Sequence, residues 1–349
     1  MNWTFYSVLT RPGRHDDEAR SLGATVINSP VELDEKFAFM RRLRATLKAG
    51  RYDVLHSHHD VVSAVYLASA IGLTIPRRIV HAHNADVHVP TGSARKSALL
   101  REPMRQLCLR LADRIVGISR HTLATFLNGR APSTPRDVVL YYGIDTAPFH
   151  AMPPDGIALR RSLGLPFDAR LMLYVGRMVS YKNPLFVVDT LADIASAEPN
   201  VYALFVGTGP LEDEVRRRAE SRGVADRVRV LGWRDDTVGL MQASDVFVFP
   251  RTEGGLGDVG IEGLGLVVVE AQAAGLPSLL SRGIPEDAIV LSDLCEMLPL
   301  SAGSKAWGDA VRRILARPRP DRAFALAAIE SSAFSLDAGL RGLTSLHRV

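Results

Sequence analysis

Two glutamates and two glycines lie close together in the second half of the sequence. Glu262 and Glu270 are eight residues apart, and Gly263 and Gly265 lie between them. Glycines let the backbone approach a ligand closely, and a helix that begins after them presents unpaired N–H groups to an anion. Glu270 would lie about one turn inside that helix. The pattern fits a ligand with a phosphate and hydroxyl groups, such as a sugar nucleotide; the alternative is a core helix with Glu270 on its solvated face.

Further glycines and two basic residues follow apolar runs in the same half of the sequence. Gly176 and Arg177 come directly after one run, Lys182 lies five residues further on, and Gly207 and Gly209 follow the next run. Ligands bind beyond the carboxyl ends of strands in doubly wound sheets. Arg177, with its fork of donors, and Lys182, with its point charge, therefore fit a diphosphate. Taken singly, each pattern is also typical of a turn or of a solvated surface.

The elements that must position these residues alternate along the chain. Short apolar runs predict strands, and apolar residues that recur every three to four positions predict helices. Strands that alternate with helices indicate parallel sheets covered on both faces. Strands are predicted at 3–9, 24–27, 52–56, 78–81, 114–118, 171–175, 201–206, 227–231 and 245–249, and helices at 33–50, 60–71, 97–112, 211–222, 266–274, 305–315, 322–330 and 336–346, with another beginning at Asn183-Pro184 as cap and first position.

The pattern begins again in the middle of the chain, which predicts two domains. Residues 148–154 contain three prolines and predict the crossover. We place an N-terminal domain at 1–150, a C-terminal domain at 151–330, and a helix at 331–349 that could cross back to the first domain. The predicted fold class is α/β, with two doubly wound, Rossmann-like parallel-sheet domains that face a cleft.

Composition indicates a globular protein of a reducing compartment. The chain has 349 residues, of which 47% are hydrophobic and 23% charged, and its two cysteines, Cys108 and Cys295, are far apart. This cysteine usage argues against a disulfide framework and lacks metal-ligand spacing. No apolar run is long enough to span a bilayer, and the N-terminus does not resemble a signal peptide. We expect a cytoplasmic location, with the inner face of the membrane as a peripheral site.

Charge is distributed unevenly. Residues 1–150 contain 20 Lys and Arg against 13 Asp and Glu, whereas the remainder contains 22 against 25. A basic half favours an anionic partner or membrane surface. Nucleic acid is not expected, because no basic motif interleaved with aromatic residues appears. The alternative is a solvated, arginine-rich surface.

The order of the motifs resembles the retaining glycosyltransferases of family 4, which have the two-domain GT-B fold. The second half contains, in order, Gly-Arg-x₄-Lys, Gly-x-Gly-Pro, Val-x-x-Leu-Gly-Trp, Ser-Asp-Val-Phe-Val-Phe-Pro and Glu-x₇-Glu. The similarity extends to residues 52–58, 78–83, 113–119 and 142–145 of the first half. It is greatest to the branch that builds exopolysaccharides and capsules, as residues 270–277 and 334–337 indicate.

The resemblance implies roles for the matched residues. Arg177 and Lys182 would bind the donor diphosphate, Glu270 the ribose hydroxyls, and Glu262 would lie beside the donor sugar, which His83 would reach from the first domain. The N-terminus of the helix predicted at 266–274 would contact a phosphate group, and the backbone near residues 231–234 would lie beside the base. The expected catalytic set is His83, Glu262, Arg177 and Lys182, and the expected donor-binding set is Gly176, Arg177, Lys182, Gly207, Gly209, Leu231, Trp233, Arg234, Gly265, Leu266, Val267 and Glu270.

Other polar residues are assigned structural roles. His56 and His58 are expected to be packed histidines at a strand end. Asp235 and Asp236 are interpreted as a helix N-terminus rather than as metal ligands. The resemblance implies no metal and no cofactor, with a UDP- or GDP-linked sugar as substrate.

The predicted function is a glycosyltransferase that moves a sugar from a nucleotide donor to a lipid-linked or saccharide acceptor in cell-surface polysaccharide biosynthesis. Positive charge and helix dipoles would stabilise the departing diphosphate, and domain closure would exclude water. A sugar-nucleotide epimerase on the same fold and a non-catalytic nucleotide-sugar binder are the alternatives. A nicotinamide-dependent enzyme is not expected, because no strand–Gly-x-Gly-x-x-Gly–helix pattern with a following acid appears.

Two features depart from the family pattern. The strand, glycine-rich loop and helix that usually precede the segment here at 2–9 are absent, so we expect a first sheet without its central strand and a chain that is poorly soluble or inactive alone. The loop 251–261 is longer than in the family and repeats part of its own sequence, because Glu253-Gly-Gly-Leu-Gly echoes Glu262-Gly-Leu-Gly. We expect Glu262 to be the sugar-side glutamate, because a glycine turn joins it directly to the helix.

Overall fold

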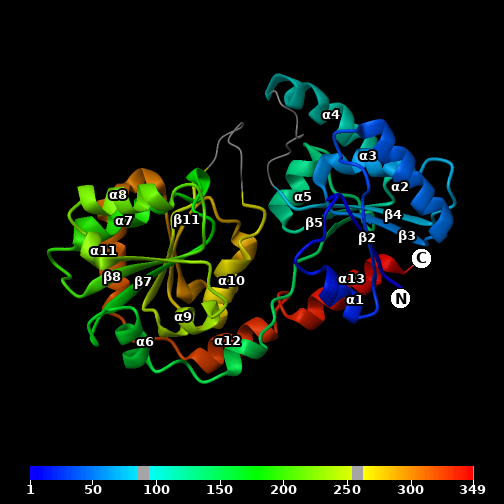
Figure 1. The fold of residues 1–349 in the computed structure, drawn as a ribbon. Coiled ribbons are helices and arrows are strands. Elements are labelled where there is room, and N and C mark those ends of the chain that lie inside the picture. Colours follow the sequence, from blue (N-terminus) through cyan, green and yellow to red (C-terminus); the bar gives the residue numbers. More distant parts are fainter. Residues whose placement is uncertain (85–93, 254–261, 349) are drawn as a thin grey trace.

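The computed structural model of the chain describes residues 1–84, 94–253 and 262–348. It contains two α/β domains built on parallel sheets, as the sequence predicts. The first domain lies at the right of Figure 1, in blue and cyan, and the second lies at the left, in green to orange. Within these residues, no helix combines the length and the hydropathy needed to cross a lipid bilayer.

The sheet of the second domain has the doubly wound strand order. All its neighbouring strands pair in parallel, in the order β12-β11-β10-β7-β8-β9. The order reverses between β7 and β10, and ligands of such sheets bind beyond the strand ends at this switch point. The strands are β7 (Arg170–Val175), β8 (Val201–Val206), β9 (Val228–Gly232), β10 (Val246–Phe249), β11 (Ser278–Ser281) and β12 (Cys295–Leu298).

Helices cover both faces of this sheet and enclose one large apolar core. β10 is buried along its whole length, and Trp307 is fully buried edge-on against Phe186, with 5.3 Å between ring centroids. Asn183 and Pro184 occupy the N-cap and first position of α7 as predicted, but Asn183 adopts a left-handed conformation and its side chain makes no capping bond. The helices are α6 (Gly156–Ser162), α7 (Pro184–Ile194), α8 (Glu212–Ser221), α9 (Thr237–Ala243), α10 (Leu266–Ala273), α11 (Gly303–Leu315) and α12 (Arg322–Glu330).

The strands of the first domain form two separate sheets. One sheet consists of β3 (Val54–Ser57), β4 (Arg77–Ala82), β5 (Arg114–Gly117) and β6 (Asp137–Val139). Among the described residues, β1 (Thr4–Ser7) pairs only with β2 (Thr25–Asn28). The helices are α1 (Asp16–Ser21), α2 (Lys36–Gly50), α3 (Ser63–Ser69), α4 (Ala94–Leu111) and α5 (Arg120–Leu127).

The last helix, α13 (Leu336–His347), packs on the first domain although it follows the second in sequence. Figure 1 shows it in red beneath the first-domain sheet, where both chain ends lie. Leu346 joins an apolar cluster with Ile79, Val116 and Leu140. The chain thus crosses between the domains twice, and the two crossings lie side by side at the parallel bridge between Ile144 and Ser335.

Direct contacts also join the domains beside the strand ends. Thr122 Oγ1 donates to the carbonyl oxygen of Gly263 at 3.0 Å. The Asp287 carboxylate accepts from the backbone N–H of Arg120 at 3.2 Å and from the Tyr141 hydroxyl at 2.5 Å. These bonds hold the carboxyl ends of the two main sheets toward each other, and the polar residues at those ends therefore share one site.

Candidate active site

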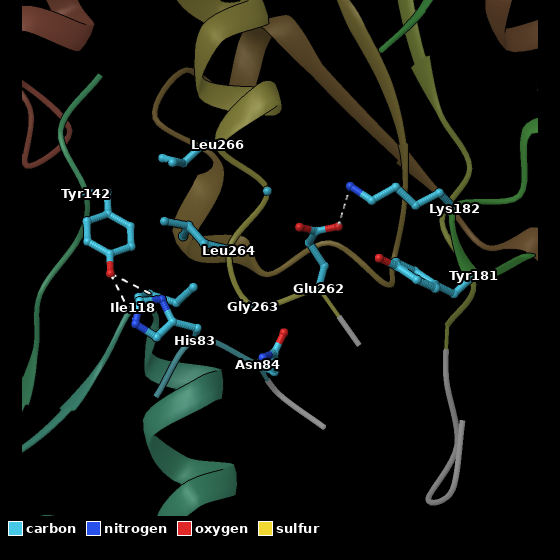
Figure 2. Close-up of a pocket in the computed structure, with 11 residues that line it drawn as sticks. His83, Asn84, Ile118, Tyr142, Tyr181, Lys182, Glu262, Gly263, Leu264 and Leu266 are labelled. Atoms are coloured by element: carbon cyan, nitrogen blue, oxygen red, sulfur yellow. Dashed lines mark hydrogen bonds and ion pairs between the residues drawn. The ribbon is translucent and has the colours of Figure 1, made fainter. Parts of the chain in front are cut away.

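A pocket of about 300 Å³ lies between the two domains, at the switch point of the second-domain sheet. Residues that follow β4, β5 and β6 form its first-domain side, and the loop after β7 and the residues that lead into α10 form its second-domain side (Figure 2). Five residues of the expected catalytic and donor-binding sets line this pocket: His83, Lys182, Glu262, Gly265 and Leu266. The lining residues are His83, Asn84, Ile118, Tyr142, Tyr181, Lys182, Glu262, Gly263, Leu264, Gly265 and Leu266.

Glu262 and Lys182 form an ion pair in this pocket. Lys182 Nζ lies 3.2 Å from Glu262 Oε2, and the two side chains are only 15% and 17% exposed. Figure 2 shows the carboxylate turned toward the ammonium group. Lys182 also lies over the ring of Phe249, with 5.1 Å to its centroid. The site therefore presents a positive and a negative group side by side, each able to bind one part of a ligand that carries both phosphate and hydroxyl groups.

Arg251 supports this ion pair and was not anticipated from the sequence. It directly follows the strand-ending Pro250, its side chain is 1% exposed, and its Nε lies 3.5 Å from Glu262 Oε2. Its Nη1 donates to the carbonyl oxygens of Thr252 and Gly283. A basic residue directly after a strand at the switch point is the sequence signal that could have indicated it.

On the first-domain side, a buried carboxylate holds the backbone of His83 in place. Asp60 Oδ1 accepts from the backbone N–H of His83 at 2.7 Å, and Asp60 Oδ2 accepts from Asn84 Nδ2 at 2.7 Å. The Tyr142 hydroxyl lies 3.1 Å from His83 Nδ1. Burial lowers the pKa of His83, which favours the neutral form of its ring. Asp60 and Asn84 were not anticipated, and Tyr142 was noted only as part of a motif.

Two glycines shape the second-domain side. Gly265 has a φ of 84° and forms the N-cap of α10, without a side-chain cap. The N–H of Val268 donates to the carbonyl oxygen of Gly265 at 2.8 Å, whereas the N–H groups of Leu266 and Val267 have no acceptor within the helix and remain available to a ligand. Gly263 packs so closely on the first domain that a Cβ atom there would lie 2.0 Å from the carbonyl oxygen of His83 and 2.7 Å from Ile118 Cδ1.

We expect Gly263→Ala to disturb the domain contact. The added methyl group cannot fit against backbone, and strain of this kind costs roughly 1–3 kcal/mol. The melting temperature should fall, and turnover of a donor should fall at least about tenfold, because small displacements of reacting groups have large effects on rate. Gly239→Ala is the matched control, since its Cβ would meet nothing closer than Pro154 Cγ at 3.5 Å. Equal behaviour of the two variants would contradict this account.

Glu270 lies inside α10 and outside the lining of the pocket. Its side chain is half-buried, and burial raises the pKa of its carboxyl group. No hydrogen bond or ion pair reaches it from the described residues. A carboxylate in this state is destabilised unless a donor pairs with it. The structure neither brings Glu270 into the pocket nor gives it another partner.

The glycines after β7 and β8 pack against each other. A Cβ atom on Gly207 would lie 2.2 Å from the carbonyl oxygen of Gly176, and one on Gly209 would lie 2.4 Å from that of Met178. The structure thus gives these glycines a packing role between two loops and does not place them at the pocket. Arg177 belongs to the same loop, and its side chain is exposed.

The remaining predicted donor-binding residues also lie outside the lining of the pocket. Trp233 is 63% exposed, with the Arg14 guanidinium 5.2 Å from its ring. Arg234 is paired with Asp236 at 2.6 Å. Asp236 is at the N-cap of α9, which agrees with the predicted helix N-terminus, although its side chain makes no capping bond. Leu231 and Val267 lie in β9 and α10.

Glu253, the second candidate for the sugar-side glutamate, is engaged elsewhere. Its Oε1 accepts from the backbone N–H of Leu300 at 2.8 Å and from that of Arg282 at 3.3 Å. Glu262 is the one that lines the pocket. The insert between them, including Asp258, lies outside the described residues.

Comparison with known proteins identifies the family. Residues 5–148 match the family model described as Glycosyltransferase Family 4, and residues 157–330 match that of Glycosyl transferases group 1. Together the two models cover nearly the whole chain. The chain belongs to the family 4 glycosyltransferases. The resemblance stated from the sequence motifs is thereby confirmed.

Individual relatives agree with this assignment. EpsF of Bacillus subtilis (strain 168), a protein described as a glycosyltransferase, is 28% identical over 330 residues, 93% of this chain and 82% of its own length. The D-inositol 3-phosphate glycosyltransferase of Mycolicibacterium gilvum (strain PYR-GCK) is 30% identical over 270 residues, 73% of this chain but 57% of that protein. The crystal structure of Anabaena Alr3699/HepE with UDP and glucose superimposes with a TM-score of 0.76 at 18% identity, over 98% of this glycosyltransferase and 90% of that chain. This structural likeness establishes the shared GT-B fold.

Proposed function

We propose that this glycosyltransferase moves a sugar, with retention of its anomeric configuration, from a UDP- or GDP-linked donor to a saccharide or lipid-linked acceptor. The observation that supports it most is the pocket between the domains, where the Lys182–Glu262 pair and the open N-terminus of α10 face His83. Lys182 and the N-terminus of α10 suit a diphosphate, and Glu262 and His83 suit a sugar. The biological setting we propose is cell-surface polysaccharide biosynthesis, by analogy with the exopolysaccharide branch of the family.

The proposed chemistry breaks the bond between the anomeric carbon and the diphosphate oxygen. The acceptor hydroxyl forms the new bond on the same face, and its proton passes to the departing diphosphate. Lys182, the exposed Arg177 and the first turn of α10 would stabilise the negative charge that develops on the leaving group. The chemistry needs no metal ion in this proposal, because these positive groups take the place that a cation would have.

Glu262 and His83 would act on the sugar from opposite sides. The Glu262 carboxylate, oriented by Arg251, would accept hydrogen bonds from sugar hydroxyls. His83, fixed through its backbone by Asp60, would contact the sugar from the first domain. The excess of basic residues in the first domain would favour contact with an anionic membrane surface that carries the acceptor.

The function is tested by incubating the chain with a panel of UDP- and GDP-sugars and analysing the products. Thermal shifts identify the donor first, since a ligand at about 100 times its Kd should stabilise the protein by roughly 2.7 kcal/mol. A transferase releases the nucleoside diphosphate from that donor. Release of an epimerised sugar nucleotide would instead indicate an epimerase, and binding without turnover at any acceptor would indicate a binding protein.

We expect Glu270→Ala to weaken nucleotide binding about tenfold or more, since a charge-assisted hydrogen bond contributes roughly 1.5–3 kcal/mol. The half-buried carboxylate has no partner among the described residues, and the ribose hydroxyls would supply one. Calorimetry with UDP or GDP measures the effect. Glu220→Ala, at an exposed position of α8, controls for loss of one negative charge from the same domain. Unchanged nucleotide affinity in Glu270→Ala would show that Glu270 does not bind the ribose.

A further inference from the structure

Five histidines from three separate segments meet on one side of the first-domain sheet. His56 lies in β3 and His58 directly follows it, while His81 lies in β4 and His83 directly follows it. Residues two apart on a strand point to the same face, and β3 and β4 are neighbours in parallel. His347 joins them from the end of α13, with its ring centroid 5.0 Å from that of His56.

We propose that His56, His58 and His81 form a binding site for a divalent transition-metal ion of the zinc class. Each offers one ring nitrogen, and the three nitrogens lie within 4.8 Å of one another. No other group of three or more His, Cys, Asp or Glu in the described part of the chain has this arrangement. Imidazole nitrogens are common ligands of zinc, copper and nickel ions.

One pair of nitrogens within this group has the spacing of a metal site. His56 Nε2 lies 3.2 Å from His81 Nδ1. In a tetrahedral zinc site with Zn–N distances of about 2.0–2.1 Å, two ligand nitrogens are about 3.3 Å apart. A small inward movement of the His58 ring, which lies 4.1 Å from that of His56 between centroids, would complete a three-histidine site with one open position.

His81 is the most deeply buried ring of the three. Its side chain is 0% exposed, and its Nε2 has no hydrogen-bond partner among the described residues. Burial of an imidazole nitrogen without a partner is unfavourable. A metal ion bound at Nδ1, the nitrogen that faces His56, would stabilise the buried ring by accepting the lone pair of Nδ1, and Nε2 would carry the proton.

The surroundings also match those of metal-bound histidines, which usually hydrogen-bond through their second nitrogen. His56 Nδ1 lies 2.8 Å from His347 Nε2, and His58 Nδ1 lies 3.0 Å from His83 Nε2. The ion would therefore fasten α13 to the sheet on one side and steady the ring of His83 on the other. Its role is structural, and its binding does not depend on the proposed transfer.

The test measures metal binding directly, on the full chain without a polyhistidine tag. The protein is stripped with a chelator, desalted and titrated with Zn²⁺ by calorimetry, and with Co²⁺ by visible absorption, which reports tetrahedral coordination. We expect one ion per chain and a higher melting temperature with metal. His58→Ala and His56→Gln should each lower the affinity by more than about a hundredfold, since even outer partners of metal ligands are worth about 10–100-fold.

His121→Ala is the matched control, because His121 is an exposed histidine of the same domain outside the cluster. It should bind Zn²⁺ like the unmodified chain. The exposed position of His58 makes His58→Ala the variant least disturbing to the fold, and circular dichroism of the metal-free proteins checks this. Failure of the unmodified chain to bind Zn²⁺, or equal affinity in the unmodified chain and the two cluster variants, would overturn the proposal.

Discussion

His83→Ala is expected to lower turnover by about 10²–10⁴, the range typical of a side chain that takes part directly in the reaction. The affinity for the nucleotide should change by less than about threefold. An interaction that is made only in the transition state contributes to turnover and not to the binding of the nucleotide in the ground state. His83 lines the pocket from the first domain, opposite the elements that would hold the nucleotide. Turnover is measured with saturating donor, and nucleotide affinity by calorimetry.

Two controls separate this effect from a general loss of structure. His121→Ala removes a histidine from the surface of the same domain and should leave turnover unchanged. Tyr142→Phe removes only the hydroxyl group that lies 3.1 Å from His83 Nδ1 and should have a smaller effect than His83→Ala. Equal losses of turnover and nucleotide affinity in His83→Ala would make His83 a binding residue instead.

Glu262→Gln is expected to lower turnover by about 10²–10³, as loss of one preorganised polar group at a reacting centre does. The substitution keeps the size of the side chain but removes the negative charge that lies 3.2 Å from Lys182 Nζ and 3.5 Å from Arg251 Nε. It would therefore weaken both the proposed contact with sugar hydroxyls and the ion pair with Lys182. Turnover on a single donor is compared with that of the unmodified chain.

Glu253→Gln is the matched control and should retain nearly full turnover. The Glu253 carboxylate accepts two backbone N–H bonds, and the amide oxygen of glutamine can accept them as well. The two glutamates begin similar sequence segments, so the comparison decides which one faces the sugar. A large loss in Glu253→Gln with full activity in Glu262→Gln would reverse the assignment.

Local patterns in the sequence determined the architecture of this glycosyltransferase. The predicted strands agree with β7, β8 and β10 to within one residue at each end, and the helix 322–330 was predicted with its observed bounds. Burial on both faces makes such strands continuous apolar runs, and the period of 3.6 residues marks the helices; both are properties of neighbouring residues. Glu262, Gly263 and Gly265 could be identified from the sequence for the same reason, because their spacing is also a property of neighbouring residues.

Only the tertiary structure decided which side chains meet. Nothing in the neighbourhood of Lys182 indicates that its partner is Glu262, 80 residues away, or that Asp60 holds the backbone of His83. The cluster of His56 with His347 joins residues that are 291 positions apart. Such contacts depend on how whole elements pack and cross between domains, and an ion pair or a hydrogen bond between distant residues leaves no period in the sequence from which it could be predicted.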